Sequence, residues 1–527
     1  MPPKSRPPAM GRPVPLAVAL LALACASPAA RSPASEAQAG GEGAFAHVRA
    51  LQAIAEANGG NRAAGTSGYD RSADYVAARL REAGYDVRLE AFTFPFFEER
   101  SPPRLLRGPA QIPVPRDELR VFVNSGAGDV TAPLRAVALG LPEGADPGAA
   151  PPASTSACAA SDFDGFERGA IALVRRGTCP FQTKVGHAVT AGAAGVVVMN
   201  EGTEGRAGGV PGRLEASPIP VVGVGFALGR ALAAEVGGDA AGVVRLAVDV
   251  ASGTRRTHNV LAELGTEPGG PGPEETIVVG AHLDGVPEGP GINDNASGSA
   301  AVLEAALGWV RAVSVSGASG ARPARRVRFA FWGAEEAGLL GSRHHLDALP
   351  EGRRRAIALY INLDMVGSPN FGRFVQGAQT DARTDTRGDD EDPAATARRT
   401  LAEAFRSRGL AVEERFGRGP RGYGSDDASF ARRGIPTVGL HTGAGERKPD
   451  DVAALFGGTA GRPYDPCYHR ACDTVENIDR AVLEQVTQAL ARTLAVLTGV
   501  EGPGADRGSV SGASRVGEPP IESGTAP

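Results

Sequence analysis

The residues of this 527-residue chain best suited to chemistry are histidines and carboxylates that follow apolar runs. In chain order they are His282, Asp284, Asp294, Glu335, Glu336, Asp364 and His469. Imidazole and carboxylate groups are the ligands that zinc takes when a site must keep positions open for water and substrate. Separate loops supply these residues, and chance rarely supplies such a set. We therefore expect them to converge on one catalytic centre.

The first cluster lies in AHLDGVPEGPGIND, residues 281–294. His282 ends the apolar run TIVVGA, so we expect its ring to project from the end of a strand into a cleft. The carboxylate of Asp284, two residues later, can orient and polarise a metal-bound imidazole. Asp294 ends a loop rich in Gly and Pro, where a turn or helix-capping role is the alternative to metal binding.

Glu335 and Glu336 are adjacent, at the end of the apolar run VRFAFWG. Neighbouring carboxylates in an apolar setting repel each other unless a cation holds one of them. We therefore expect one glutamate to bind metal and the other to accept a proton from water. A surface helix N-terminus, expected from about residue 336, is the alternative.

Asp364 closes the run IALYINLD and so resembles His282 in its position at a strand end.

The composition is that of an ordinary soluble protein with room for two or three domains. Apolar residues make up 42% of the chain, and the formal net charge is -5. This charge gives no support to nucleic-acid binding, which would need a basic patch.

The N-terminus resembles an export signal. Lys4, Arg6 and Arg12 precede an apolar run over 14–24 that is too short to span a bilayer stably. Cys25 ends that run in LALAC, which is similar to the lipobox of bacterial lipoproteins. Two outcomes stay open, lipidation of Cys25 or simple cleavage nearby, so the protein is secreted, periplasmic or anchored to the outer membrane. We expect membrane contact only through this anchor, because no other segment is long and apolar enough to cross a membrane.

Four further cysteines form two pairs that are close in sequence, Cys158 with Cys179 and Cys467 with Cys472. Export favours two disulfides, each closing one loop, over the alternative of four free thiols. The second pair would fix Tyr468 and His469, which suits a metal ligand and a hydrogen-bond donor to a transition state.

Strands that alternate with helices predict an α/β domain with a mostly parallel central sheet flanked by helices. A β-rich segment that holds none of the seven residues interrupts it. We divide the chain into a signal peptide (1–25), a flexible linker (26–43), the N-terminal part of the main domain (44–104), an inserted domain (105–253), the main domain (254–500) and a disordered tail (501–527).

The inserted segment resembles a protease-associated (PA) domain. The similarity rests on GAIALVRRGTCPFQTKVGHAVTAGAAGVVVMNE, residues 169–201, with the order strand, turn, helix, strand. In the proteases that carry it, this domain is non-catalytic. We accordingly interpret His187 as structural.

The main domain carries, in chain order, the motifs HxD, GINDNASG, FWGAEE, NLDMVGS, GSDDASF, PTVGLHTGA and CYHRACDT. With this set it resembles the double-zinc secreted aminopeptidases, of bacterial leucyl type, within the glutamate-carboxypeptidase and transferrin-receptor superfamily. The resemblance covers 257–500 and the helices at 45–84. The resemblance implies a zinc exopeptidase fold and two Zn²⁺ ions per chain.

The resemblance also implies a role for each residue. Asp294 would bridge both zinc ions, His282 and Asp364 would complete one site, and Glu336 and His469 the other. Glu335 would be the general base for a water nucleophile, and Tyr468 would stabilise the tetrahedral intermediate. Residues implied in substrate binding are Met365, Asp426 and His441.

Two positions depart from the family pattern. Gly424 stands where some close relatives have Arg, with Arg421 as a substitute to anchor the substrate. His441 replaces an aromatic residue near the pocket, which weakens the case for large apolar first residues.

The implied function is removal of N-terminal residues from peptides with a free N-terminus by a monomeric enzyme. The alternatives are a carboxypeptidase or dipeptidase of the same superfamily, a single-zinc glutaminyl cyclase, and a non-catalytic receptor. Ca²⁺ is compatible with the chain as an additional ion but is not specified by it.

Overall fold

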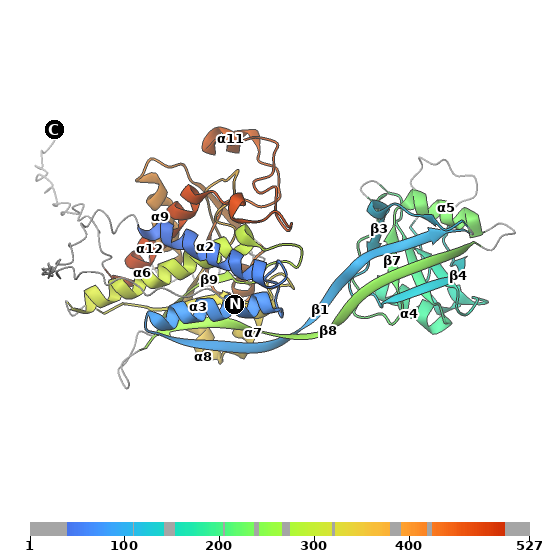
Figure 1. Cartoon of the computed structure of the whole chain (residues 1–527), viewed down its shortest axis with the longest axis horizontal. Helices are drawn as coiled ribbons and strands as arrows, with labels where there is room; N and C mark the ends of the chain where they lie inside the picture. Colours follow the sequence, from blue (N-terminus) through green and yellow to red (C-terminus); the bar gives the residue numbers. More distant parts are fainter. Residues whose placement is uncertain are drawn as a thin grey trace, which may run out of the picture.

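The computed structural model describes residues 39–108, 110–141, 153–203, 206–236, 242–265, 275–318, 322–379, 392–418 and 424–500. The predicted signal peptide with Cys25, most of the linker, Arg421 and the tail from 501 lie outside these ranges. The described chain forms a larger and a smaller lobe joined by one two-stranded ribbon (Figure 1).

The larger lobe is built on a mostly parallel sheet. In spatial order its strands are β13 (Glu413–Arg418), β12 (Phe374–Gln379), β14 (Thr437–His441), β11 (Ile357–Leu363), β9 (Thr276–His282) and β10 (Arg326–Trp332). Strand β9 pairs in parallel with both β10 and β11, and β14 pairs in parallel with β11. Strand β12 is antiparallel to β14. The predicted fold class is therefore confirmed.

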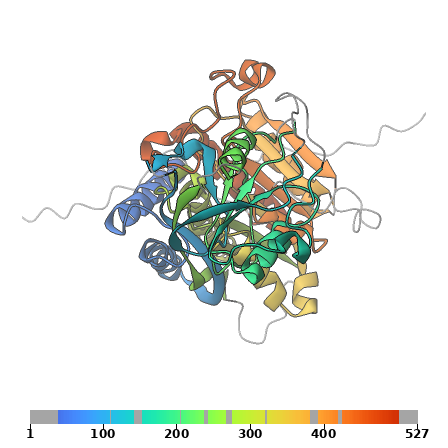
Figure 2. The same ribbon diagram turned by 90° about the vertical axis from the view of Figure 1, so that its right-hand side faces the viewer.

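Helices cover both faces of this sheet. One layer consists of α2 (Ala39–Ala57), α3 (Ser67–Glu82), α6 (Gly298–Ala318), α9 (Pro393–Arg406) and α12 (Arg480–Thr498). The opposite layer contains α7 (Leu340–Ala348) and α10 (Asp427–Ala431). Shorter elements are α8 (Glu351–Arg355), α11 (Asp450–Phe456), η3 (Ile292–Ser297) and η4 (Val475–Asn477). Figure 2, which faces the smaller lobe, shows α2 and α3 in blue on one flank.

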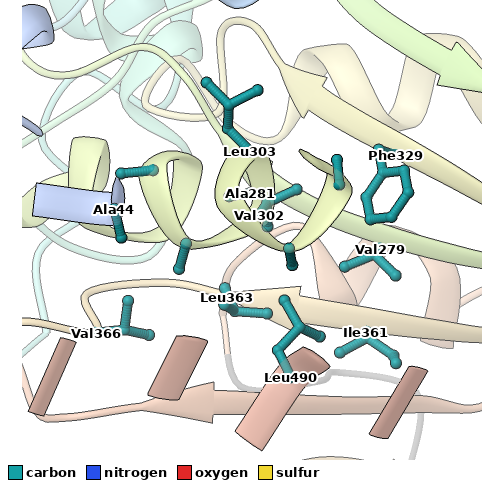
Figure 3. Close-up of a cluster of buried hydrophobic side chains, with 14 of the residues drawn as sticks. Ala44, Val279, Ala281, Val302, Leu303, Phe329, Ile361, Leu363, Val366 and Leu490 are labelled. Carbon is teal, nitrogen blue, oxygen red and sulfur yellow. The ribbon is translucent and has the colours of Figure 1, made fainter. Parts of the chain in front are cut away.

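The buried strands explain why the sequence reads as continuous apolar runs rather than alternating ones. Ile277 and Val279 of β9 point toward the first helix layer, and Val278 between them points toward the second. All three are fully buried. A parallel sheet covered on both faces requires apolar residues at every position. Figure 3 shows Val279 and Ala281 packed beside Val302 of α6 and Leu490 of α12.

The expectation that no further segment is long and apolar enough to cross a membrane is wrong for the segment that includes helix α6. Residues 292–317 are long and apolar enough, by length and composition, to cross a membrane. In the structure, however, Val302 and Leu303 are buried in the main core, between the sheet and helices α2 and α12. The helix is apolar because it is packed on more than one side, as the central helix of a globular lobe is.

The ribbon between the lobes consists of β1 (Tyr85–Arg107) and β8 (Val243–Leu264), which pair antiparallel along their length. The alternating stretch VRLEAFTF, residues 87–94, covers only part of β1, which continues to Arg107. The domain boundaries predicted at 104/105 and 253/254 both fall inside these continuous strands.

The smaller lobe contains the predicted order strand, turn, helix, strand as β5 (Ile171–Arg175), α4 (Phe181–Ala191) and β6 (Gly195–Met199). His187 Nδ1 lies 3.0 Å from the carbonyl oxygen of Ala157, which agrees with a structural role. The other elements of this lobe are β2 (Ile112–Pro113), η1 (Arg116–Glu118), β3 (Leu119–Val121), β4 (Gly128–Ala136), η2 (Ala160–Phe163), β7 (Val221–Val224) and α5 (Phe226–Val236).

Candidate metal centre

Three neighbouring parallel strands bring the predicted residues to one edge of the sheet. His282 is the last residue of β9, Asp364 follows β11, and Glu335 and Glu336 follow β10. Parallel strands end on a common crevice, where α/β sheets place their ligand sites. Asp294 reaches the same crevice from η3, the turn that leads into α6.

Asp294 lies between two imidazoles. Its Oδ1 is 3.3 Å from His282 Nε2, and its Oδ2 is 3.1 Å from His469 Nε2. Asp364 Oδ1 is 3.4 Å from His282 Nε2, and Glu336 Oε2 is 3.2 Å from His469 Nε2. The five predicted ligands thus form two half-sites that share the Asp294 carboxylate.

The donor atoms fit a metal ion. Within the described ranges, two groups have ligand atoms that all lie within 4.8 Å of one another, and both belong to this centre: His282 with Asp294 and Glu336, and His282 with Glu335 and Asp364. Glu336 Oε1 is buried and has no hydrogen-bond partner, so it has a lone pair free for coordination. This mixture of nitrogen and oxygen donors suits Zn²⁺.

The electrostatics also indicate that the site needs a cation. Burial raises the pKa of Glu335 well above its usual value, and burial together with the charge of Asp294 raises the pKa of Glu336 to about 7. Burial lowers the pKa of His469, but its hydrogen bonds to Asp294 and Glu336 outweigh this and raise it to about 10. The raised pKa values favour protonation of Glu335 and Glu336 when no metal is bound, and a divalent cation would take the place of those protons.

The role predicted for the Asp284 carboxylate is corrected. His282 Nδ1 lies 3.0 Å from the backbone oxygen of Asp284 and 3.9 Å from the nearer carboxylate oxygen. The carboxylate instead accepts the backbone N–H groups of Glu335, at 3.1 Å, and Glu336, at 3.3 Å. Asp284 therefore holds the turn that carries both glutamates, and its backbone orients the imidazole.

The expected helix from residue 336 is also corrected, because α7 begins at Leu340. Residues 335–339 form a tight turn in which the N–H groups of Gly338 and Leu339 donate to the carbonyl oxygen of Glu335. Ala334 and Leu339 both have positive φ, so the chain cannot continue as a helix there.

Both expected disulfides are present, Cys158–Cys179 and Cys467–Cys472. The second closes the segment that carries Tyr468 and His469 (the disulfide loop, residues 467–472). Within it the two rings stack with their centroids 3.9 Å apart, and His469 has a left-handed φ of 57°. The disulfide thus closes a loop in which the backbone of His469 has a conformation that non-glycine residues rarely adopt, and this fixes the position of the imidazole.

Comparisons with known proteins place this centre in a family. The model of peptidase family M28 matches residues 259–494, which include all the residues of the centre, and a PA-domain model matches residues 131–232. An aminopeptidase of Pseudomonas aeruginosa is 40% identical over 454 residues, covering 84% of this chain and 78% of that protein. The chain belongs to peptidase family M28.

Another relative of this M28 peptidase is a probable lipoprotein aminopeptidase of Mycobacterium tuberculosis. It is 36% identical over 445 residues, covering 83% of this chain and 81% of that protein. Among solved structures, an aminopeptidase from Aneurinibacillus sp. strain AM-1 has the same fold, with a TM-score of 0.60 and 24% identity over 89% of this chain and 96% of that one.

The residues predicted to bind substrate differ in accessibility. Met365 and Asp426 are 2% and 0% exposed, whereas His441 is half-buried and its Nδ1 lies 2.7 Å from the backbone oxygen of Asp364. Burial raises the pKa of Asp426 to about 7. A fully buried carboxylate argues for an indirect role, so substrate binding by these residues stays a prediction. Gly424 begins the last described range, and Arg421 lies outside it.

Two buried residues beside the centre were not selected from the sequence. Arg62 donates to three backbone carbonyls around the site, and Asp473 accepts two backbone N–H groups there. The partners that tie them to the site are peptide groups, which leave no side-chain signal. For Asp473, the only sign of a role in the sequence was its place in the motif CYHRACDT.

Proposed function

We propose that this M28 peptidase is a zinc-dependent aminopeptidase that uses two metal ions to hydrolyse the peptide bond after a free N-terminal residue. The observation that carries the proposal is the Asp294 carboxylate, which offers one oxygen to each of two half-sites. The name of the Pseudomonas aeruginosa relative, an aminopeptidase, supports the same activity.

His282, Asp294 and Asp364 would hold one zinc ion, and Asp294, Glu336 and His469 the other. When bound, the two ions would act as Lewis acids that make water more acidic and polarise the scissile carbonyl. The remaining steps fall to the side chains of the protein.

Glu335 is the proposed general base. Its raised pKa and its position within 4.8 Å of the donor atoms of His282 and Asp364 suit a group that takes a proton from the attacking water. As the water oxygen bonds to the carbonyl carbon and the C–N bond breaks, Glu335 returns that proton to the leaving amine. Asp284 fixes the backbone from which Glu335 projects.

Tyr468 is the proposed donor to the carbonyl oxygen of the tetrahedral intermediate. Burial, with the negative charges of Asp294 and Glu336, raises the pKa of its phenol, so the hydroxyl keeps its proton at neutral pH. Its side chain is 36% exposed, so a substrate can reach it.

We further propose that the enzyme is exported, lipidated at Cys25 and active as a monomer on peptides. Two disulfides in the described chain support an oxidising compartment. The relative from Mycobacterium tuberculosis, named as a probable lipoprotein, supports the anchor. Mass spectrometry of the purified native protein would detect a lipidated Cys25, and an unmodified N-terminus beyond it would exclude the anchor.

The deciding experiment combines metal analysis with a substrate panel. We expect two equivalents of zinc per chain and hydrolysis of aminoacyl anilides that is lost with a chelator and regained with zinc. N-blocked dipeptides should resist cleavage; their cleavage instead of the anilides would favour a carboxypeptidase. Protein that binds no zinc would favour a non-catalytic receptor, and cyclisation of N-terminal glutamine with one zinc would favour a cyclase.

A further inference from the structure

The segment that runs from the end of β9 into η3 sets the spacing of two proposed ligands (the 283–294 loop). His282 immediately precedes it, and Asp294 is its last residue. The two arms of the loop meet at its neck, where a Cβ added to Gly285 would lie only 3.3 Å from the Cα of Gly291. Whatever holds this neck closed therefore fixes the distance between His282 and Asp294.

Arg62 holds the neck from one side. It lies in the turn between α2 and α3, and its side chain is fully buried. Its Nε donates to the carbonyl oxygen of Pro290 at 2.9 Å, and its two terminal nitrogens donate to the carbonyl oxygens of Leu283 and Gly291. One guanidinium thus binds both arms of the 283–294 loop.

Asp473 holds the loop from the other side. Its carboxylate accepts the N–H groups of Asn293, at 2.8 Å, and Asp294, at 3.0 Å, and it is 2% exposed. Its backbone oxygen accepts the N–H of Ile292 at 3.2 Å. Because Asp473 directly follows Cys472, it also ties the loop of Asp294 to the disulfide loop of His469.

The charge of Arg62 is a cost rather than a benefit at this place. Burial lowers its pKa to about 10, although the carboxylates of Asp284 and Asp473 oppose the effect. A buried cation also repels the zinc ions proposed nearby. What arginine offers is a rigid, planar set of five N–H donors carried on three separate nitrogens, whereas the three donors of a lysine ammonium all start from one nitrogen and cannot take the same three directions.

We propose that Arg62 is a positioning residue of the metal centre, which together with Asp473 fixes the separation of His282 and Asp294 before metal binds. The inference rests on the proposed two-zinc function. It makes the segment before α3 part of the site, although that segment supplies no ligand.

Zinc affinity of the full-length protein tests the proposal, with Arg62→Lys compared against a matched control. Arg175 is likewise fully buried, in the smaller lobe, and donates to the carbonyl oxygens of Leu139, Gly140 and Glu201. Arg175→Lys therefore imposes the same chemical loss far from the zinc site. In competition with a chelator, we expect Arg62→Lys to bind zinc roughly 10- to 100-fold more weakly than wild type, and Arg175→Lys to match wild type.

Amide hydrogen exchange of the metal-free proteins gives a readout that does not depend on activity. Amides of the 283–294 loop should exchange faster in Arg62→Lys than in Arg175→Lys. Asp473→Asn, which replaces one acceptor oxygen with a donor, should accelerate the same amides, and it carries the test if Arg62→Lys does not fold.

Two results would overturn the inference alone: wild-type zinc affinity and loop exchange in Arg62→Lys and Asp473→Asn, or an equal loss of affinity in Arg175→Lys. A wild-type protein that takes up no zinc would contradict the proposed function, and the inference would fall with it.

Discussion

Glu335 and Glu336 are neighbours in the chain, yet the geometry gives them different tasks. Glu336 Oε2 lies 3.2 Å from His469, in a half-site with Asp294, whereas Glu335 groups with His282 and Asp364. We predict that Glu335→Gln keeps its zinc and lowers kcat by about 10²- to 10⁴-fold, the usual contribution of a general base. Metal analysis and steady-state kinetics measure both quantities.

Glu336→Gln is the matched control for that experiment, because it removes the same charge one residue further on. It should lose zinc, since Glu336 faces His469 directly. An unchanged kcat in Glu335→Gln would contradict its role as the base, and full zinc content in Glu336→Gln would contradict the division of labour.

Individual residues also show what the sequence could predict. His282 and Asp364 were predictable because a polar side chain stands out after a buried apolar strand. Arg62 was not, because an arginine in the turn NGGNRAAG looks like a surface residue. Its partners are carbonyls more than 220 residues away, and peptide groups are the same at every position.

At the scale of elements, the disulfide loop is the clearest case of a segment that preorganises a proposed metal ligand, His469. We predict that the double variant Cys467→Ser, Cys472→Ser binds zinc more weakly, because His469 must then be ordered at the moment of binding. Closing so short a loop is worth about 2 kcal/mol, so the loss should reach roughly tenfold or more. Titration with zinc against a competing chelator gives the affinity.

The other disulfide supplies the control for this loop. Cys158→Ser with Cys179→Ser opens a loop in the smaller lobe and should leave zinc affinity unchanged. Equal losses in both double variants would mean that general destabilisation, and not release of His469, is responsible.

The ribbon strands show why elements were harder to predict than ligands. The stretch FPFFEERSPPRLLR in β1 contains prolines and charges that normally end a strand. It stays extended because β8 pairs with it from Tyr85 to Arg107, with register shifts at Glu99, Ser101 and Arg104 that absorb the Pro-Pro step. That partner lies some 150 residues away, so local sequence could not reveal it.

A buried pair between β1 and α7 couples folding to pH. His345 Nδ1 lies 2.9 Å from Glu90 Oε2. Burial alone would raise the pKa of Glu90, but the hydrogen bond from His345 and the neighbouring Asn259 and Arg88 lower it to about 2. Burial lowers the pKa of His345, whose Nε2 faces Arg328 at 3.1 Å, so the imidazole is neutral in the fold.

The pKa values of Glu90 and His345 are both lowered in the fold, so both groups make the protein less stable as the pH falls. Because the pKa of Glu90 is lowered, its carboxylate stabilises the fold above the unfolded value near 4.5, and this stabilisation is lost as the pH falls toward 2. Because the pKa of His345 is also lowered, the fold loses further stability as the pH falls below about 6.5. We predict that Glu90→Gln costs about 2 to 3 kcal/mol at pH 7, and much less only as the pH falls to about 2. Urea unfolding of the metal-free proteins measures this, and a pH-independent difference would contradict it.

For the whole molecule, the two lobes are separate in their packing. The main core joins the sheet of the larger lobe to α2, α6 and α12, and none of the residues described between 108 and 242 belongs to it. The smaller lobe has its own two clusters. The inserted domain was predictable because its composition changes and the chemistry-bearing residues are absent from it. Its attachment through one continuous ribbon was not.

This separation predicts that the metal centre survives removal of the smaller lobe. Glu98 and Ala251 are cross-strand partners in the ribbon, so an Asn-Gly turn can join them and replace residues 99–250. All proposed ligands and Glu335 remain, as does the core beneath them. We expect two zinc equivalents and an unchanged kcat on an aminoacyl anilide. A shortened chain that unfolds in one cooperative transition, yet no longer binds zinc, would show that the smaller lobe helps to form the site.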